Sequence, residues 1–352
     1  MSYELNKKIK ELVPYEPISG TYKIRLDANE SPYNFTDEIK QAVQKVVSKI
    51  DFNRYPDPLA TELINSFAKY YDINPEYVTA GNGSDELIFL VESAFLEKGD
   101  KMLVVSPDFS MYNFYSSICE VDCDSFIKDE NLNIDVDAMI NKVNNDNIKL
   151  VIFSNPCNPT GQGITAEQAR KLVSQTNALV ILDEAYMDFW DQSLIWEVDK
   201  YSNLIVFRTA SKAVGAAALR LGFAIANTTI SRALKAVKSP YNVNSISQAI
   251  GAVLYKKKEY LQNQKKIIVK NREKLYNELT KIADNHDDFT VYPSCTNFVL
   301  VKTSFGKELW EYLKSNSIVI RYMGDYIRIT AGTPYEIEQT VKYIKKFLQG
   351  DK

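Results

Sequence analysis

Six short apolar runs between about residues 78 and 227 constrain the fold of this chain more than any other feature. They read VTAG, KMLVVS, KLVIFS, ALVILD, NLIVF and GFAIA, and segments with helical periodicity separate them. The runs are short and continuously apolar rather than alternating, which is typical of strands buried on both faces of a parallel sheet. The pattern therefore predicts an α/β fold with a mostly parallel central sheet sandwiched by helices.

The rest of the chain predicts a second, smaller unit. Thr36 precedes apolar residues at helical spacing and is expected to cap the first regular element after an N-terminal arm. The last third contains a long charged helical stretch, three strand-like segments (TNFVLV, IVIR and YIRIT) and a closing helix. With 352 residues, 45% of them apolar, the chain can bury two cores. We therefore expect a large α/β domain over 36–250 and a smaller α+β domain that 251–352 forms with the arm 1–35. A continuous helical segment near 245–260 should join them.

Charge and composition limit the partners. Charged residues make up 25% of the chain and the formal net charge is −3, with no long basic or acidic block. Neither nucleic acid nor an anionic membrane is therefore expected as a partner. The N-terminal sequence lacks the apolar run of a signal peptide, and no window approaches the roughly 18 apolar residues of a membrane span. We expect a cytoplasmic protein whose partners are small molecules or a second copy of itself.

Cysteine and histidine usage restricts the chemistry. The four cysteines follow no metal or disulfide spacing, and the single histidine, His286, lies in the polar stretch ADNHDDF. We therefore expect no metal site and no histidine-based triad. Catalysis would depend on Lys, Tyr, Asp or Arg side chains, or on a cofactor.

Polar residues follow two of the apolar runs at the edge where open α/β sheets bind ligands. After VTAG comes GNGSDELIFL, in which Ser84 and Asp85 open a helix behind Gly83. The free N–H groups and the dipole of such a helix start suit a phosphate, although the same turn can simply cap a helix. After KLVIFS comes SNPCNPTGQG, a loop that is either only rigid or aims an asparagine at a ligand.

Ionisable residues follow two further runs. Asp183 ends ALVILD, where a buried carboxylate suggests a cation or a protonated ring nitrogen as its partner. A helix N-cap role would also explain Asp183, but not Tyr186 after it. After NLIVF, the segment FRTASKAVGAAALRLGF sets Lys212 among small residues, with Arg220 eight positions on. A lysine shielded from water can attack a carbonyl, although a surface turn is the simpler interpretation of this segment alone.

The four features together match the needs of one cofactor, pyridoxal 5′-phosphate. Its aldehyde requires a lysine, its protonated ring nitrogen an acid, its phenolate oxygen a hydrogen-bond donor, and its phosphate a helix start with an arginine. The four apolar runs supply these groups in succession, and we therefore expect this cofactor.

At this point the sequence resembles the fold type I pyridoxal-phosphate aminotransferases, and specifically the histidinol-phosphate aminotransferase family. The resemblance runs along nearly the whole chain, through LDANESPY, RYPD, GNGSDE, SNPCNPTG, DEAYMDF, RTASKAVGAAALRLGF, PYNVNS, NFVLV and IRITAGT. The Asn-Pro loop, the DEAY segment and the Ser-Lys segment are individually specific. The resemblance implies a large cofactor-binding domain and a smaller second domain.

The resemblance also implies roles for individual residues. Lys212 resembles the Schiff-base lysine and Asp183 the partner of the ring nitrogen, while Tyr186 and Asn158 resemble the donors to the ring oxygen. Phe109 occupies the place of the aromatic residue that stacks on the ring. The residues that resemble the phosphate site are Gly83, Ser84, Asp85, Thr209, Ser211 and Arg220. Asp85 would act there through its backbone amide, because its carboxylate would repel a phosphate.

Substrate binding and assembly follow from the same resemblance. Arg328 resembles the arginine that binds the substrate carboxylate, and Arg321 the one that grips the distal acidic group. Tyr15 and Tyr241 are candidates for closing the site over the substrate. Tyr55 resembles a tyrosine that reaches the phosphate of the neighbouring subunit, which implies a homodimer with shared active sites.

The activity implied is a ping-pong amino transfer between histidinol phosphate and 2-oxoglutarate, with glutamate as the product of the second half, in histidine biosynthesis. Lys212 would move a proton between substrate and cofactor while Asp183 keeps the ring nitrogen protonated. An aromatic amino acid aminotransferase and a phosphothreonine decarboxylase are alternatives that use the same cofactor. A DNA-binding regulator of this fold is not expected, because the first predicted element already belongs to the aminotransferase pattern. A cofactor-free homologue would not need Lys212, Asp183, Tyr186 and Asn158 together.

Four positions depart from the family pattern. Phe109 stands where many relatives carry tyrosine, and Cys157 replaces a common asparagine, which we interpret as a change without functional effect. The segment between Arg321 and Arg328 is shorter than in many relatives. The run Ala216–Ala218 replaces a glycine-containing turn, and its influence on Arg220 is open.

Overall fold

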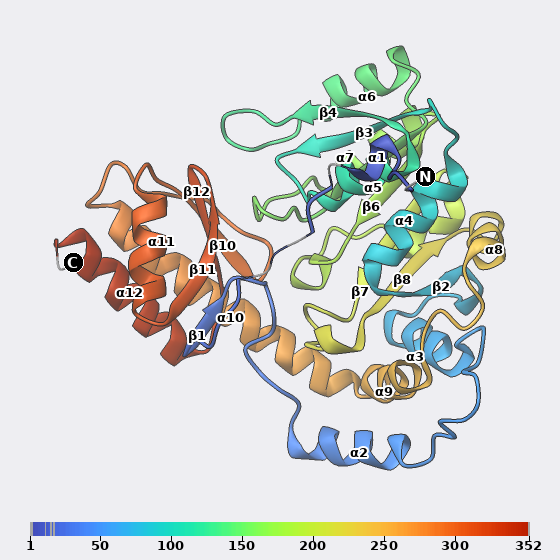
Figure 1. Cartoon of the computed structure of the whole chain (residues 1–352), viewed down its shortest axis with the longest axis horizontal. Helices are drawn as coiled ribbons and strands as arrows, with labels where there is room; N and C mark the ends of the chain where they lie inside the picture. The colour runs from blue at the N-terminus through green and yellow to red at the C-terminus, as the bar shows by residue number, and fades with distance from the viewer. Residues whose placement is uncertain (1–2, 11, 15, 17, 351–352) are drawn as a thin grey trace.

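Two β-sheets organise the computed structural model, which describes residues 3–10, 12–14, 16 and 18–350. Figure 1 shows the larger sheet with its helices on one side of the molecule and the smaller sheet on the other. Helix α10 (Lys258–Ala283) runs from the one toward the other. The active-site candidates therefore come from two separately packed units.

The larger sheet has seven strands in the order β2-β8-β7-β6-β5-β3-β4. Their bounds are β2 Val78–Asn82, β3 Lys101–Ser106, β4 Asp122–Ile127, β5 Leu150–Ser154, β6 Leu179–Asp183, β7 Leu204–Thr209 and β8 Leu221–Ala226. Only β8 runs antiparallel to its neighbours. The mostly parallel sheet is thus confirmed, and all six apolar runs are strands. The seventh strand, β4, was not predicted because its sequence DCDSFI is mainly exposed at the sheet edge.

Helices cover both faces of this sheet, which explains why its strands are apolar on both sides. One face packs on α3 (Thr61–Tyr71), α6 (Val136–Asn145), α7 (Ala166–Gln175) and α9 (Ser245–Lys256). The other face packs on α4 (Gly83–Phe95), α5 (Met111–Cys119) and α8 (Thr228–Val237). Short 3-10 turns are η1 Pro75–Tyr77, η2 Met187–Phe189, η3 Ile195–Lys200 and η4 Ala217–Leu219. The α/β layering is the predicted one.

The smaller sheet has five strands in the order β1-β11-β12-β10-β9. Their bounds are β1 Ile24–Leu26, β9 Thr290–Val291, β10 Phe298–Lys302, β11 Ile318–Met323 and β12 Tyr326–Thr330. A separate core joins it to α10, α11 (Gly306–Ser315) and α12 (Pro334–Leu348). The strand β1 pairs in parallel with β11, so the N-terminal segment completes this sheet.

Three local expectations were wrong. The first regular element does not begin at Thr36, because α1 (Lys7–Lys10) and β1 precede it. Thr36 holds the N-cap position of α2 (Asp37–Val47), but its side chain makes no capping hydrogen bond. The helical junction is not continuous either, since Lys257 takes a non-helical conformation between α9 and α10. Where the two domains divide stays a prediction.

Across the residues that the structure describes, none of the helices is both long enough and apolar enough to cross a lipid bilayer.

Candidate active site

Asp183 lies at the carboxyl end of β6, in the middle of the larger sheet, and is 4% exposed. Its Oδ2 accepts a hydrogen bond from the Tyr112 hydroxyl at 2.8 Å, and its Oδ1 accepts one from the Ala185 N–H at 3.1 Å. Burial raises the pKa of the Asp183 carboxyl to about 7, although the Tyr112 hydrogen bond opposes the shift. A cation placed against this carboxylate would lower its pKa again and keep it ionised.

Tyr186 and Lys212 face each other beside the N-terminal segment. The Tyr186 hydroxyl accepts a hydrogen bond from Asn29 Nδ2 at 2.9 Å, and its ring packs edge-on against Phe298 of the smaller sheet. Lys212 Nζ lies 5.7 Å from the centre of the Tyr186 ring and donates to the Ala28 carbonyl at 3.1 Å. The amine is therefore held at the junction of the two sheets, within reach of the groups predicted to act with it.

The start of α4 lies beside Arg220, which was predicted to bind the same phosphate. Gly83 opens the helix with φ +84°, and a β-carbon on it would come within 2.8 Å of an Arg220 guanidinium nitrogen. A β-carbon on Gly222 would lie 2.5 Å from the Ser84 nitrogen, so two glycines allow strand β8 to approach the helix start. Arg220 also pairs with the Asp85 carboxylate at 3.0 Å. A phosphate bound here would share Arg220 with that carboxylate.

The turn before Arg220 directs its side chain toward the start of α4. Residues Ala217–Leu219 form η4, and Arg220 follows in a left-handed conformation with φ 49°. The hydroxyls of Thr209 and Ser211 lie 3.0 Å apart at the end of β7. Thr209 ends β7 and Ser211 follows it, whereas Arg220 directly precedes β8, which pairs with β7.

Asn158 and Arg328 connect the two units of the molecule. A guanidinium nitrogen of Arg328 donates to Asn158 Oδ1, and another donates to the Asp27 carbonyl at 2.6 Å. Arg321 and Arg328 are directly opposite each other on the antiparallel strands β11 and β12. Only Gly324 and Asp325 separate these strands, so the short loop expected from the sequence is a tight hairpin. It places both arginines on one face of the sheet.

The remaining predicted residues lie in two other places. Phe109 follows β3 and meets Tyr112 edge-on at 5.6 Å, next to the acid that Tyr112 holds. Tyr55 and Tyr241 stack on each other at 4.6 Å and are 81% and 43% exposed. No hydrogen bond or ring contact found in the described residues joins this pair to the other predicted side chains. Tyr15 lies outside the described residues.

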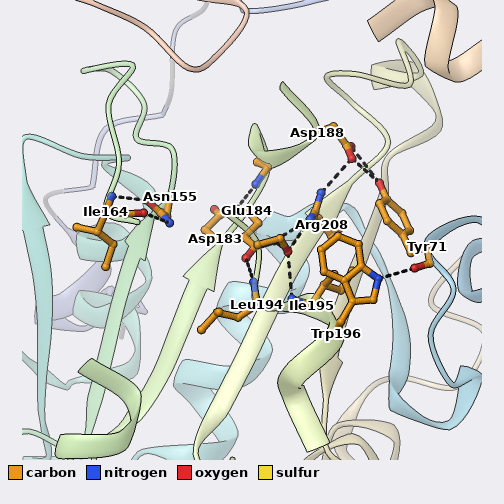
Figure 2. Close-up of polar contacts among 12 residues, drawn as sticks. Tyr71, Asn155, Ile164, Asp183, Glu184, Asp188, Leu194, Ile195, Trp196 and Arg208 are labelled. Atoms are coloured by element: carbon orange, nitrogen blue, oxygen red, sulfur yellow. Dashed lines mark hydrogen bonds and ion pairs between the residues drawn. The ribbon is translucent and has the colours of Figure 1, made fainter. Parts of the chain in front are cut away.

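A buried ion cluster behind the site links β6 to β7. Arg208 lies between the carboxylates of Glu184 and Asp188, at 2.8 and 3.0 Å (Figure 2). The Ser193 hydroxyl donates to Glu184, and the Tyr71 hydroxyl donates to Asp188 at 2.9 Å. The Arg208 side chain is only 4% exposed and that of Glu184 is fully buried. The cluster thus fixes the turn that carries Asp183 and Tyr186 against the strand that leads to Lys212.

Sequence reasoning missed several of these residues. Glu184 and Arg208 stand directly beside predicted residues, and each is a charge that follows an apolar run, which was an available signal. Asn29 lies within the quoted motif LDANESPY but received no role, and Tyr112 lies three residues after Phe109. Sequence reasoning also missed the contact of the Cys157 sulfur with the buried amine of Lys128 at 2.9 Å, while the absence of a functional effect stays a prediction.

The arrangement suits a ligand with three chemical features. A protonated ring nitrogen would supply the cation that Asp183 needs, an aldehyde would suit the Lys212 amine, and a phosphate would suit the start of α4. The donor set therefore fits pyridoxal phosphate. No group of three or more His, Cys, Asp or Glu side chains within the described ranges could hold a metal ion.

Comparisons with known proteins agree with this chemistry. The sequence pattern of the family "Aminotransferase class I and II" matches residues 21–344. A histidinol-phosphate aminotransferase from Clostridium novyi is 40% identical over 344 residues, which cover 96% of each chain. The crystal structure of the histidinol-phosphate aminotransferase from Clostridium acetobutylicum is 25% identical, with a TM-score of 0.83 over 93% of this chain and 99% of that one.

A third relative supports the fold alone. The histidinol-phosphate aminotransferase from Sinorhizobium meliloti, solved in complex with pyridoxal-5′-phosphate, has a TM-score of 0.87 at 22% identity. That superposition covers 97% of this chain and 98% of the other. The expected fold and family are confirmed. The chain belongs to the aminotransferase class I and II family and is a pyridoxal-phosphate-dependent transaminase of fold type I.

Proposed function

We propose that this transaminase exchanges the amino group of histidinol phosphate with 2-oxoglutarate, as a step of histidine biosynthesis in the cytoplasm. The observation that carries the proposal is the pair Arg321 and Arg328, which stand opposite each other on β11 and β12 next to Asn158. Guanidinium groups bind phosphate and carboxylate with the same fork geometry. One pair can therefore serve a phosphorylated amine in the first half-reaction and a dicarboxylate in the second.

The cofactor would be held by residues at the carboxyl edge of the larger sheet. We assign its phosphate to Gly83, Ser84, Asp85, Thr209, Ser211 and Arg220, with the Asp85 contribution coming from its backbone N–H. We assign its ring to Phe109, Asn158, Asp183 and Tyr186. When bound, pyridoxal phosphate supplies a ring that accepts electrons from the substrate carbon.

The protein's own part in the reaction is proton transfer and positioning. Lys212 Nζ takes the proton from the substrate carbon and returns it during product formation, in the role of a general base and acid. The Asp183 carboxylate holds a proton at the ring nitrogen, and burial strengthens that ion pair because water does not compete for it. Tyr186 and Asn158 supply hydrogen bonds to the ring oxygen. Arg328 and Arg321 orient the substrate, and Tyr241 and Tyr15 close over it.

A homodimer with shared sites is the proposed assembly. Tyr55 stacks on Tyr241 at the surface, and the nearby Phe52 and Leu59 are 70% and 57% exposed. Apolar side chains this exposed suit burial against a partner. Their position supports a role for Tyr55 in the site of a second subunit.

The substrate is tested by single-turnover reaction of the cofactor-loaded enzyme with histidinol phosphate, phenylalanine and phosphothreonine. Loss of the visible absorbance of the bound cofactor measures each reaction. We expect histidinol phosphate to react fastest, by at least tenfold over phenylalanine. A faster reaction with phenylalanine, or release of carbon dioxide from phosphothreonine, would refute the proposed substrate.

The shared site is tested by mixing two inactive variants, Lys212→Ala and Tyr55→Ala. A mixed dimer has one site with both defects and one site with neither, so activity should return toward a quarter of the wild-type level after subunit exchange, because half of the dimers are mixed. If Tyr55 acts within its own subunit, mixing restores no activity. Light scattering on each variant alone is the control that both remain dimers.

A further inference from the structure

Lys128 and Cys157 form a contact that the proposed reaction does not use. Lys128 follows the edge strand β4, and Cys157 lies in the loop after β5. Lys128 Nζ lies 2.9 Å from Cys157 Sγ, and the two residues are 7% and 1% exposed. A lysine is seldom this buried without a charged partner.

The surroundings hold the amine against the sulfur. Lys128 Nζ also donates to the Pro107 carbonyl at 3.2 Å and to the Thr160 hydroxyl at 3.3 Å. Cys157 Sγ in turn lies 3.5 Å from the same carbonyl. None of the ion pairs found in the described part of the chain includes Lys128. Two neutral groups therefore hold the amine in contact with the thiol. The Asp108 carboxylate acts on Lys128 electrostatically, but no ion pair between them is found in the described residues.

We propose that Lys128 and Cys157 are an oxidative modification site, at which a peroxide couples the lysine nitrogen to the cysteine sulfur. Hydrogen peroxide first oxidises the thiol to a sulfenic acid and is reduced to water. The Lys128 amine then attacks the sulfur, an N–S bond forms, and the S–O bond breaks to release a second water. The sulfur loses two electrons to one peroxide, and one N–H and one S–H hydrogen leave in the two waters. Sulfenic acids condense with backbone nitrogens in the same way.

The oxidant would approach the pair from the Lys128 side. A cavity of about 180 Å³ borders Lys128, between the segment Leu132–Ile134 and the segment Gln162–Ile164. Peroxide is not much larger than water and can enter such a space. Burial and the Asp108 carboxylate raise the pKa of the Cys157 thiol, whereas the Lys128 ammonium lowers it. The Tyr112 hydroxyl is a further titratable group that interacts with this thiol. Because the thiolate is the form that reacts, we expect faster coupling as the pH rises.

Coupling would reach the cofactor through the next residue. Asn158 follows Cys157, its N–H donates to the Ser154 hydroxyl at 3.0 Å, and its side-chain oxygen accepts from Arg328. An N–S bond is much shorter than the present 2.9 Å contact, so its formation draws the two side chains together and pulls on the loop that carries Cys157. Asn158 would move with Cys157, and the coupled enzyme should transfer amino groups more slowly.

The experiment is peptide mapping of the cofactor-loaded enzyme after treatment with hydrogen peroxide, without added reductant. We expect a peptide containing Lys128 joined to one containing Cys157, lighter by two hydrogen atoms than the two peptides together. Dithiothreitol should separate them. The proposal is overturned if Cys157 stays unmodified, or if it gains only oxygen atoms while both peptides remain separate.

Variants test each partner while keeping the shape of the site. Cys157→Ser replaces the sulfur by an oxygen and should prevent coupling, whereas Cys119→Ser, which changes a thiol at the end of α5, should leave it intact. In Lys128→Arg the guanidinium is a poor nucleophile, so the sulfenic acid should accumulate and react with dimedone. Enzyme activity should fall in proportion to the coupled fraction and recover with dithiothreitol, but not fall in Cys157→Ser. Full activity in the coupled protein would refute the predicted effect on Asn158.

Discussion

Replacing Arg208 by methionine tests whether the buried cluster behind the active site stabilises the protein. Methionine fills a similar volume but leaves the carboxylates of Glu184 and Asp188 without their shared cation. Asp188 keeps the Tyr71 hydroxyl as a donor, whereas Glu184, which is fully buried, keeps only the Ser193 hydroxyl and the Leu194 N–H. The uncompensated charge on Glu184 should therefore account for most of the stability lost in Arg208→Met.

The magnitude follows from the burial of the pair. Removing one partner of a buried ion pair costs about 3–5 kcal/mol, because the remaining charge stays desolvated. Arg208→Met should lower the free energy of unfolding by about that amount. Neutralising the abandoned acid in the double variant Arg208→Met/Glu184→Gln should recover about 1–3 kcal/mol, since a glutamine side chain loses less on burial than an unpaired carboxylate.

The assay is equilibrium unfolding in urea, followed by tryptophan fluorescence, on the wild type, both single variants and the double variant. A thermodynamic cycle separates the interaction of Arg208 with Glu184 from the two individual effects. Equal stability of Arg208→Met and the wild type would refute the reasoning, and so would a double variant whose loss is the sum of the two single losses. In either case the cluster would not act as a coupled unit.

Four further predictions concern the site itself. Lys212→Ala should abolish the visible absorbance of the bound cofactor and all amino transfer, and unchanged absorbance would mean that another amine binds the aldehyde. Asp183→Asn should lower kcat by about 10²–10⁴-fold without unfolding the protein. Because the pKa of Asp183 is raised to about 7 in the folded protein, its carboxyl ionises at lower pH in the unfolded chain. The free energy of unfolding of the cofactor-free protein should therefore fall as the pH rises from about 4 to about 7. Urea titrations at several pH values should show this dependence in the wild type and not in Asp183→Asn. Tyr112→Phe should raise the pKa of Asp183 further, because the Tyr112 hydroxyl stabilises the ionised carboxylate. The loss of stability should then start at the same pH but continue to a higher pH than in the wild type. Arg328→Lys should raise KM for both substrates about tenfold or more with a smaller change in kcat, because a lysine cannot make the bidentate contact.

The sequence predicted correctly the strands that are buried on both faces of the sheet. All six apolar runs are strands because helices cover both faces of the sheet, so the interior positions of these strands are mainly apolar. The edge strand β4 has no such requirement, since it is mainly exposed and pairs with β3 on one side only. Its sequence therefore carries no burial signal.

The sequence predicted the positions of residues that end a strand or begin a helix, whereas their roles stay predictions. Asp183, Thr209 and Gly83 lie at positions that follow directly from the order of the elements, because the carboxyl ends of parallel strands share one edge. Asn29 could not be placed in this way. Its contacts with Tyr186 and Thr330 depend on how the N-terminal segment passes between the two sheets.

The sequence by itself determined the strands, the helix starts and the set of chemical groups at the sheet edge, because these depend on local periodicity and on residue type. Only the tertiary structure decided which groups meet. It brought Tyr112 to Asp183, Arg328 to Asn158, and Lys128 to Cys157. Each of these contacts joins residues that are distant in the chain, and strand order and side-chain packing, which no local pattern encodes, set the distance between them.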